Sequence, residues 1–73
     1  MSEFNFDKTF QAFRGKCVES EQHEKDWQGT IDYIEEYSLT HEVFMSASHS
    51  YRDDMTRQEA VDAICIAMMD WDL

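Results

Sequence analysis

The sequence predicts a mostly α-helical fold: a small bundle of three to four short helices in a single domain that spans residues 1–73. In several segments apolar residues recur every three or four positions, which is the spacing of one face of a helix. None of the 73 residues is proline and only two are glycine, whereas a sandwich or barrel of β-hairpins needs many turn residues. The stretch 56–73 also begins with a helix-start pattern.

The stretch 56–73 is predicted to form the last helix and the centre of the core. Thr56 precedes Glu59 by three residues, which is the spacing of a capping box, in which each side chain bonds to the other residue's backbone N–H. Apolar residues follow in steps of three, four and three at Val61, Ile64, Met68 and Trp71. We expect segment 60–68 to pack against an apolar set from the earlier helices: Phe6, Phe10, Phe13, Trp27, Ile31 and Ile34.

A first helix is predicted over residues 6–18. Phe6, Phe10, Phe13 and Cys17 are four, three and four positions apart, so they form one apolar stripe. Asn5 or Ser2 is the expected N-cap. Three phenylalanines on one stripe favour a core position over a binding surface.

A second helix is predicted to begin near residue 26. The preceding segment 19–25 holds no apolar residue, and we expect it to be a solvated linker or a helix end. Asp26 is an acceptable N-cap, and Trp27, Ile31 and Ile34 then form a stripe.

The segment 40–51 is ambiguous. With a period of two, alternate residues from Val43 to Tyr51 suit a short β element at 43–51. With a period of 3.6, Val43, Phe44, Ala47 and Tyr51 share a helical face behind Thr40 as N-cap. We prefer the helix because no other segment alternates and a lone strand has no partner to pair with. Residues 52–55 are then the turn into the last helix.

The charge of the chain excludes several functions. The net charge is −10, with sixteen acids and six bases. From Cys17 onward there are fourteen acids and three bases: Lys25, Arg52 and Arg57. Such a surface repels nucleic acid and anionic membranes and attracts a basic partner. Six unclustered bases also cannot neutralise several phosphates, so we expect no direct binding of nucleic acid.

The two cysteines, Cys17 and Cys65, both lie on predicted apolar faces. Two buried, reduced thiols are expected; the alternative of a disulfide would require export. The N-terminal sequence lacks the basic and apolar regions of a signal peptide, and no stretch reaches the ~20 apolar residues that span a membrane. We therefore expect a cytoplasmic protein.

No residues are predicted to act in catalysis or to bind a metal or cofactor. The sequence contains no zinc-binding spacing of cysteine and histidine, no glycine-rich phosphate loop and no nucleophile elbow. A helical chain of this length has little room for a pocket, so an enzyme is not expected.

One short stretch, Tyr37-Ser38-Leu39 followed by THEVFMSA, resembles the acyl carrier proteins, which carry a modified serine at the start of a helix. The resemblance covers about ten residues. It implies a phosphopantetheine on Ser38. The chain departs from the family in having Tyr37 where the family has an aspartate, and in the short span between Ser38 and the last helix.

Partner-binding residues are predicted in two places. Asp32, Glu35 and Glu36 stand three and four apart on the exposed face of the second helix, with no lysine or arginine to offset their repulsion. Glu42 extends this patch. The second place is the C-terminal tip, where Asp70 and Asp72 lie at the negative end of the last helix. Trp71 between them is expected to serve either as a core residue or as an anchor for the partner.

By size and charge the chain resembles the small acidic phage-encoded factors that disable a host nucleic-acid enzyme. We expect an inhibitory or regulatory protein that binds a basic surface of RNA polymerase or of a CRISPR or restriction effector, and that occludes or displaces its nucleic acid or initiation factor. The host cytoplasm is then its location. The alternative is a structural or self-assembling helical adaptor, which includes a homo-oligomer.

Overall fold

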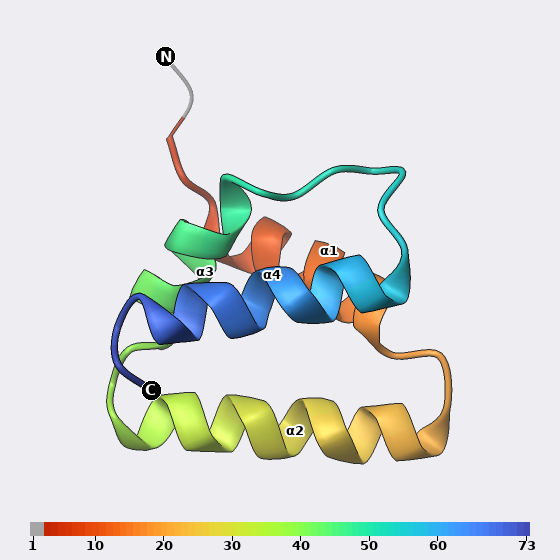
Figure 1. Ribbon diagram of the computed structural model, residues 1–73, viewed down its shortest axis with the longest axis horizontal. Helices are drawn as coiled ribbons and strands as arrows, with labels where there is room; N and C mark the ends of the chain where they lie inside the picture. Colours follow the sequence, from red (N-terminus) through yellow and green to blue (C-terminus); the bar gives the residue numbers. More distant parts are fainter. Residues whose placement is uncertain (1–2) are drawn as a thin grey trace.

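The chain folds into a small all-α bundle. The computed structural model describes residues 3–73, and within them it contains four helices and no strand: α1 (Phe6–Cys17), α2 (Glu21–Glu36), α3 (Thr40–Ser48) and α4 (Arg57–Met69) (Figure 1). The mostly α-helical prediction is confirmed. Segment 43–51 is helical as far as Ser48, so the alternative of a short β element there is wrong.

The helices α1, α3 and α4 pack closely on one another, and α2 lies along one side of them. The α3–α4 pair is in the most extensive contact, followed by α1–α3 and α1–α4. In Figure 1, α2 and α4 run in the same direction, and their carboxyl ends lie on the same side of the molecule. These two helices contact each other least of all the pairs, so α2 is held mainly through α1 and α3.

Side-chain caps start three of the helices. The Asn5 side chain accepts from Lys8 N at 3.0 Å, as predicted, and Ser2 lies outside the described residues. The capping box is also confirmed, because Thr56 accepts from Glu59 N at 3.2 Å and Glu59 accepts from Thr56 N at 2.9 Å. Each such cap stabilises a helix by ~1 kcal/mol.

Two predicted helix starts are wrong. The second helix begins at Glu21, not near Asp26, because the Ser20 hydroxyl accepts from His23 N at 3.2 Å and caps the helix six residues before the predicted cap, Asp26. Segment 21–25 is therefore the polar first part of α2 and not a linker. For α3, the N-cap is Leu39 and makes no side-chain bond, so Thr40 is the first helical residue and not the cap.

The ends of α2 and α4 share one geometry. Ser38 and Asp72 each adopt a left-handed backbone with φ of 58°. The next residue then donates to a carbonyl near the end of the helix: Leu39 N to Ile34 O at 3.3 Å, and Leu73 N to Met68 O at 3.1 Å. This Schellman arrangement turns an apolar residue back onto the core. The last helix thus ends at Met69, not at residue 73.

Phe44 of α3 lies at the centre of the core, although the sequence patterns predict the last helix in that place. Its side chain has no exposed surface. The Phe44 ring centroid lies 5.2–6.0 Å from four other aromatic centroids, contributed by α1 and α2: Phe6, Phe10, Phe13 and Trp27. Rings at this distance and in edge-on or tilted arrangements attract one another beyond simple burial.

The last helix contributes mainly small side chains to the core. Its buried residues are Ala60, Ala63, Ile64 and Ala67. Alanines allow the α4 backbone to approach α1 and α3 closely. The predicted stripe is therefore rotated: Ile64 is buried, Val61 and Met68 are half-buried, and Trp71 is 41% exposed.

We predict that Phe44→Ala lowers the free energy of unfolding by about 3–5 kcal/mol, because it leaves a cavity between α1, α2 and α3. A domain of this size is only marginally stable, so the variant should be largely unfolded at room temperature. Met45→Ala is the matched control on the same helix, since Met45 is exposed and its loss should change stability by less than about 0.5 kcal/mol. Urea unfolding followed by circular dichroism measures both, and equal stabilities would contradict the central position of Phe44.

Candidate functional site

The structure brings most of the predicted acidic residues to one end of the molecule. The carboxyl ends of α2 and α4 lie together on the left of Figure 1. Five exposed carboxylates occupy this region, which we call the acidic end: Asp32, Glu35, Glu36, Asp70 and Asp72. The two patches that the sequence predicts separately therefore belong to one end of the fold.

No basic side chain offsets these carboxylates within their own helices. Neither α2 nor α4 has a lysine or arginine in its last turn. The sequence has no base between Lys25 and Arg52 and none after Arg57. Both helices also point the negative ends of their dipoles to the acidic end, where acidic side chains are unfavourable by a few tenths of a kcal/mol each. Helix stability therefore does not explain why carboxylates occupy these positions.

Glu42 and Trp71 are the predicted partner-binding residues outside this set of five, and one member of the set, Asp70, already accepts a hydrogen bond. Glu42 is half-buried on α3, and its Oε2 atom is buried without a hydrogen-bond partner among the described residues. Asp70 accepts a hydrogen bond from the Ser46 hydroxyl at 3.3 Å. Trp71 is 41% exposed, so it lies at the surface and not in the core.

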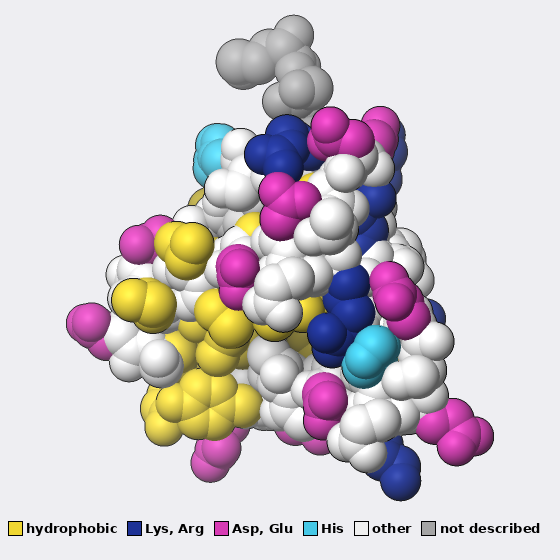
Figure 2. All heavy atoms as spheres, turned by 45° about the vertical axis from the view of Figure 1, so that its right-hand side comes forward, with side chains coloured by type: hydrophobic (Ala, Val, Ile, Leu, Met, Phe, Trp, Pro, Cys, Tyr) yellow, Lys and Arg dark blue, Asp and Glu magenta, His cyan; other side chains and the backbone are white. Residues whose placement is uncertain are grey.

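Basic residues gather away from the acidic end. Figure 2 shows a band of lysine and arginine side chains to the right of centre and a concentration of hydrophobic side chains at the lower left. Arg14 pairs with Glu24, and Arg52 pairs with Asp54 and Glu59. The lysines and arginines therefore lie away from the acidic end, but acids surround them, since eleven of the sixteen acids also lie outside that end.

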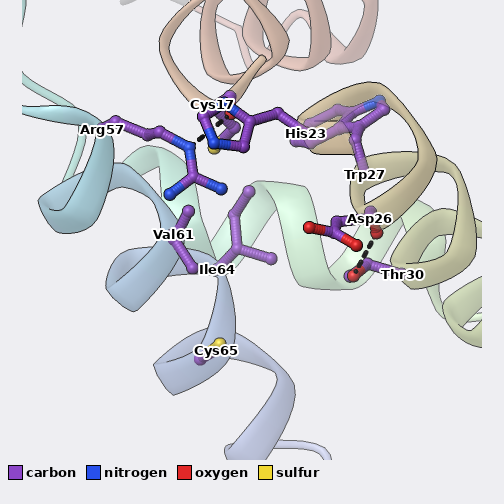
Figure 3. A pocket seen from close by; sticks show the side chains of 9 residues that line it. All are labelled: Cys17, His23, Asp26, Trp27, Thr30, Arg57, Val61, Ile64 and Cys65. Atoms are coloured by element: carbon purple, nitrogen blue, oxygen red, sulfur yellow. Dashed lines mark hydrogen bonds between the residues drawn. The ribbon is translucent and has the colours of Figure 1, made fainter. Parts of the chain in front are cut away.

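A cavity of about 200 Å³ opens between α2 and α4. Figure 3 shows its polar rim, where the Arg57 guanidinium and the Asp26 carboxylate face the cavity from opposite helices. The Nε of Arg57 donates to the Cys17 carbonyl at 2.9 Å. Below the rim the lining is mostly apolar and includes the buried side chains of Trp27 and Ile64. The complete lining is Cys17, His23, Asp26, Trp27, Thr30, Arg57, Val61, Ile64 and Cys65.

Beyond the cavity, exposed tyrosine and methionine side chains lie on the helical rows that its lining residues begin. On α2 the lining residues Asp26 and Thr30 lead, in helical steps of three and four, to Tyr33 and Tyr37, which are 41% and 54% exposed. On α4 the lining residues Val61 and Cys65 lead in the same way to Met69, which is 68% exposed. We call the surface between these two rows the α2–α4 groove, and its members are Asp26, Thr30, Tyr33, Tyr37, Arg57, Val61, Cys65 and Met69.

The apolar stripes in the sequence do not predict this groove, because each helix shows one stripe that is expected to face the core. The row Val61, Cys65 and Met69 is a second apolar row on α4, displaced from the buried one. That displaced row is the sequence feature that could have revealed the groove.

The two cysteines line the same cavity but differ in exposure. Cys17 is 4% exposed, and burial raises the pKa of its thiol to about 11, although the nearby Arg57 acts in the opposite direction. Cys65 is exposed, so the prediction of two buried thiols is wrong for this residue. Both are free thiols.

Three further observations on the described residues concern metal binding, membrane crossing and the acyl-carrier resemblance. Residues 3–73 contain no group of three or more histidine, cysteine, aspartate or glutamate side chains that could hold a metal ion. None of the four helices is long and apolar enough to cross a membrane. Ser38, the serine of the acyl-carrier resemblance, is exposed in the turn between α2 and α3.

Comparisons of the chain with protein-family models, with curated proteins and with solved structures find no match.

We predict that one of the two thiols reacts readily with iodoacetamide. At pH 8 only about one Cys17 thiol in a thousand is ionised, and its side chain is shielded, so alkylation should occur at Cys65. Intact mass should show a single fast addition, and peptide mapping should place it on Cys65. The Cys65→Ser variant should show no fast addition. Comparable alkylation rates at Cys17 and Cys65 in the folded protein would contradict the burial of Cys17.

Proposed function

We propose that this chain is a small acidic inhibitory or regulatory protein whose acidic end binds a basic surface of a host nucleic-acid enzyme. One observation carries the proposal: the fold gathers five exposed carboxylates at the joint carboxyl ends of α2 and α4, with no base in the last turn of either helix. Carboxylates kept where they destabilise a helix are better explained by a partner than by folding.

The mechanism follows from the charge of both surfaces. Enzymes that act on nucleic acid hold phosphates with lysine and arginine, and carboxylates can occupy the same side chains. Complementary charge speeds the encounter, and it fixes how the two surfaces meet. Exposed aromatic side chains at this end, Tyr37 and Trp71, supply the apolar contacts that charged pairs alone lack. The target is an RNA polymerase or a CRISPR or restriction effector, and the result is occlusion of its nucleic acid or displacement of a factor, as with phage-encoded inhibitors.

Self-assembly as a helical adaptor is the rival function. The large exposed fractions of Ile66 and Met69, 60% and 68%, favour it, because such residues are often covered in an assembly. The net charge of −10 opposes it, since identical copies repel one another.

We predict that the double variant Glu35→Lys, Glu36→Lys abolishes target binding without loss of the fold. Lysines in the last turn of α2 interact favourably with the helix dipole, so the variant should be at least as stable as the unmodified chain. Affinity capture from bacterial lysate at low salt should recover one nucleic-acid enzyme, and this enzyme should be released at high salt. The purified enzyme should be inhibited by the unmodified chain and not by the variant.

The matched control is Glu3→Lys, Glu19→Lys, which makes the same change in net charge at two exposed positions outside the helices. It should retain capture and inhibition. A discrete oligomer that captures no enzyme would contradict the proposal and support the adaptor.

A further inference from the structure

We propose that the α2–α4 groove receives an amphipathic helix from the partner, and that this helix lies antiparallel to α2 and α4 with its basic residues near its amino end. The inference rests on the proposed function in one respect, that the partner is a protein with a basic surface. It adds a second contact region, the α2–α4 groove, and it states that a helix of the partner occupies this groove.

The shape of the groove suits a helix. Two helices that run in the same direction (Figure 1) border the cavity and carry the exposed rows beyond it. The α4 wall has 13 residues, which at 1.5 Å per residue is about 20 Å, or between three and four helical turns. A third helix laid along such a channel packs on both walls as in a bundle. The deeper part, of about 200 Å³, accepts a large apolar side chain from it.

Toward the acidic end the side chains of the groove are apolar and exposed, and Tyr33 and Tyr37 pack on each other with ring centroids 5.3 Å apart. The exposed fractions of Tyr33, Tyr37 and Met69 are 41%, 54% and 68%. Tyrosine and methionine are enriched in protein interfaces, where tyrosine supplies a rigid contact area and methionine adapts to the partner. An amphipathic helix with apolar residues at spacings of three and four presents a matching row.

The charge along the groove sets the direction of the incoming helix. At one end the Arg57 side chain faces the cavity, and its Nε alone is engaged, by the Cys17 carbonyl (Figure 3). Arg57 forms no ion pair with any described residue. Beside it, His23 Nδ1 accepts from Glu19 N at 3.1 Å, so in the neutral ring Nε2 carries the proton and is a donor. Asp26 on the same rim already accepts from Gln22 at 3.0 Å.

The donors at this end match the carboxyl end of a helix, where backbone carbonyls are unpaired and the dipole is negative. At its other end the groove runs toward the acidic end and the negative ends of two helix dipoles. Lysines or arginines near the amino end of the incoming helix would be placed there. The antiparallel direction matches Arg57 and the acidic end at once, and the parallel direction matches only Asp26.

Two synthetic peptides of 18 residues test this inference. Both carry leucines at helical spacing and have the same composition and net charge. In the forward peptide the lysines occupy the amino-terminal half and two glutamates the last turn; in the reverse peptide these charges are exchanged. Backbone NMR titration measures the affinities, and protection of Cys65 from iodoacetamide shows whether the groove is covered. We expect the forward peptide to bind at least about tenfold more tightly and to slow alkylation of Cys65 by a similar factor.

Two variants of α4 distinguish binding of the peptide in the groove from its general electrostatic attraction to an acidic protein. Cys65→Lys places a charge on the groove wall and should weaken forward-peptide binding about tenfold, since the ammonium would be buried under the helix. Ile66→Lys makes the same charge change at the next residue, which is 60% exposed and outside the two rows of the groove, and it should leave binding within about twofold. Equal affinity of the two peptides, unprotected Cys65, or equal effects of the two variants would overturn the inference.

The captured enzyme distinguishes this inference from the proposed function. If the Glu35→Lys, Glu36→Lys variant loses the enzyme and Cys65→Lys retains it at full affinity, the acidic end is the binding site and the groove inference is wrong. If the forward peptide occupies the groove but no enzyme is captured by the unmodified chain, the proposed function is wrong and the groove inference stands.

Discussion

The packing of the Phe44 ring between α1 and α2 is the contact on which the rest of the structure depends. Phe44 belongs to the short helix α3, and its ring meets three phenylalanines of α1 and Trp27 of α2. One side chain thereby joins three helices. In the same core, the small residues Ala60, Ala63 and Ala67 let α4 approach α1 and α3 closely. Because α2 and α4 are each attached to the α1–α3 pair, the surface between them is left open.

This arrangement also determines where charge collects. The helices α2 and α4 run in the same direction, so both negative dipole ends and the acids at or just beyond them lie at one end of the molecule. The bases lie on α1 and near the starts of α2 and α4. The molecule thus has an acidic end, an apolar groove and a remaining part that carries all six bases and the other eleven of the sixteen acids. A partner with a basic, amphipathic surface would match the first two of these regions together.

Local patterns predicted the parts of the fold that depend on neighbouring residues. The capping box at Thr56, the cap at Asn5 and the phenylalanine row of α1 all involve residues a few positions apart, and the sequence shows them directly. The start of α2 was missed because its first turn is polar and exposed, and only the Ser20 cap marks it. The central position of Phe44 was missed because it depends on contacts between distant segments. The acidic residues were identified by composition, but their meeting at one end follows from the parallel course of two helices. The groove lies between two helices, and the apolar pattern of one helix does not show which other helix lies beside it.

A solution NMR measurement of nuclear Overhauser effects from the Phe44 ring tests the account most directly. Ring centroids at 5.2–6.0 Å predict contacts from Phe44 to Phe6, Phe10, Phe13 and the indole of Trp27. Those contacts would show that α3 joins α1 and α2, which is the condition for an open α2–α4 groove. A Phe44 ring that lacks contacts to Trp27 and lies open to solvent would contradict the account.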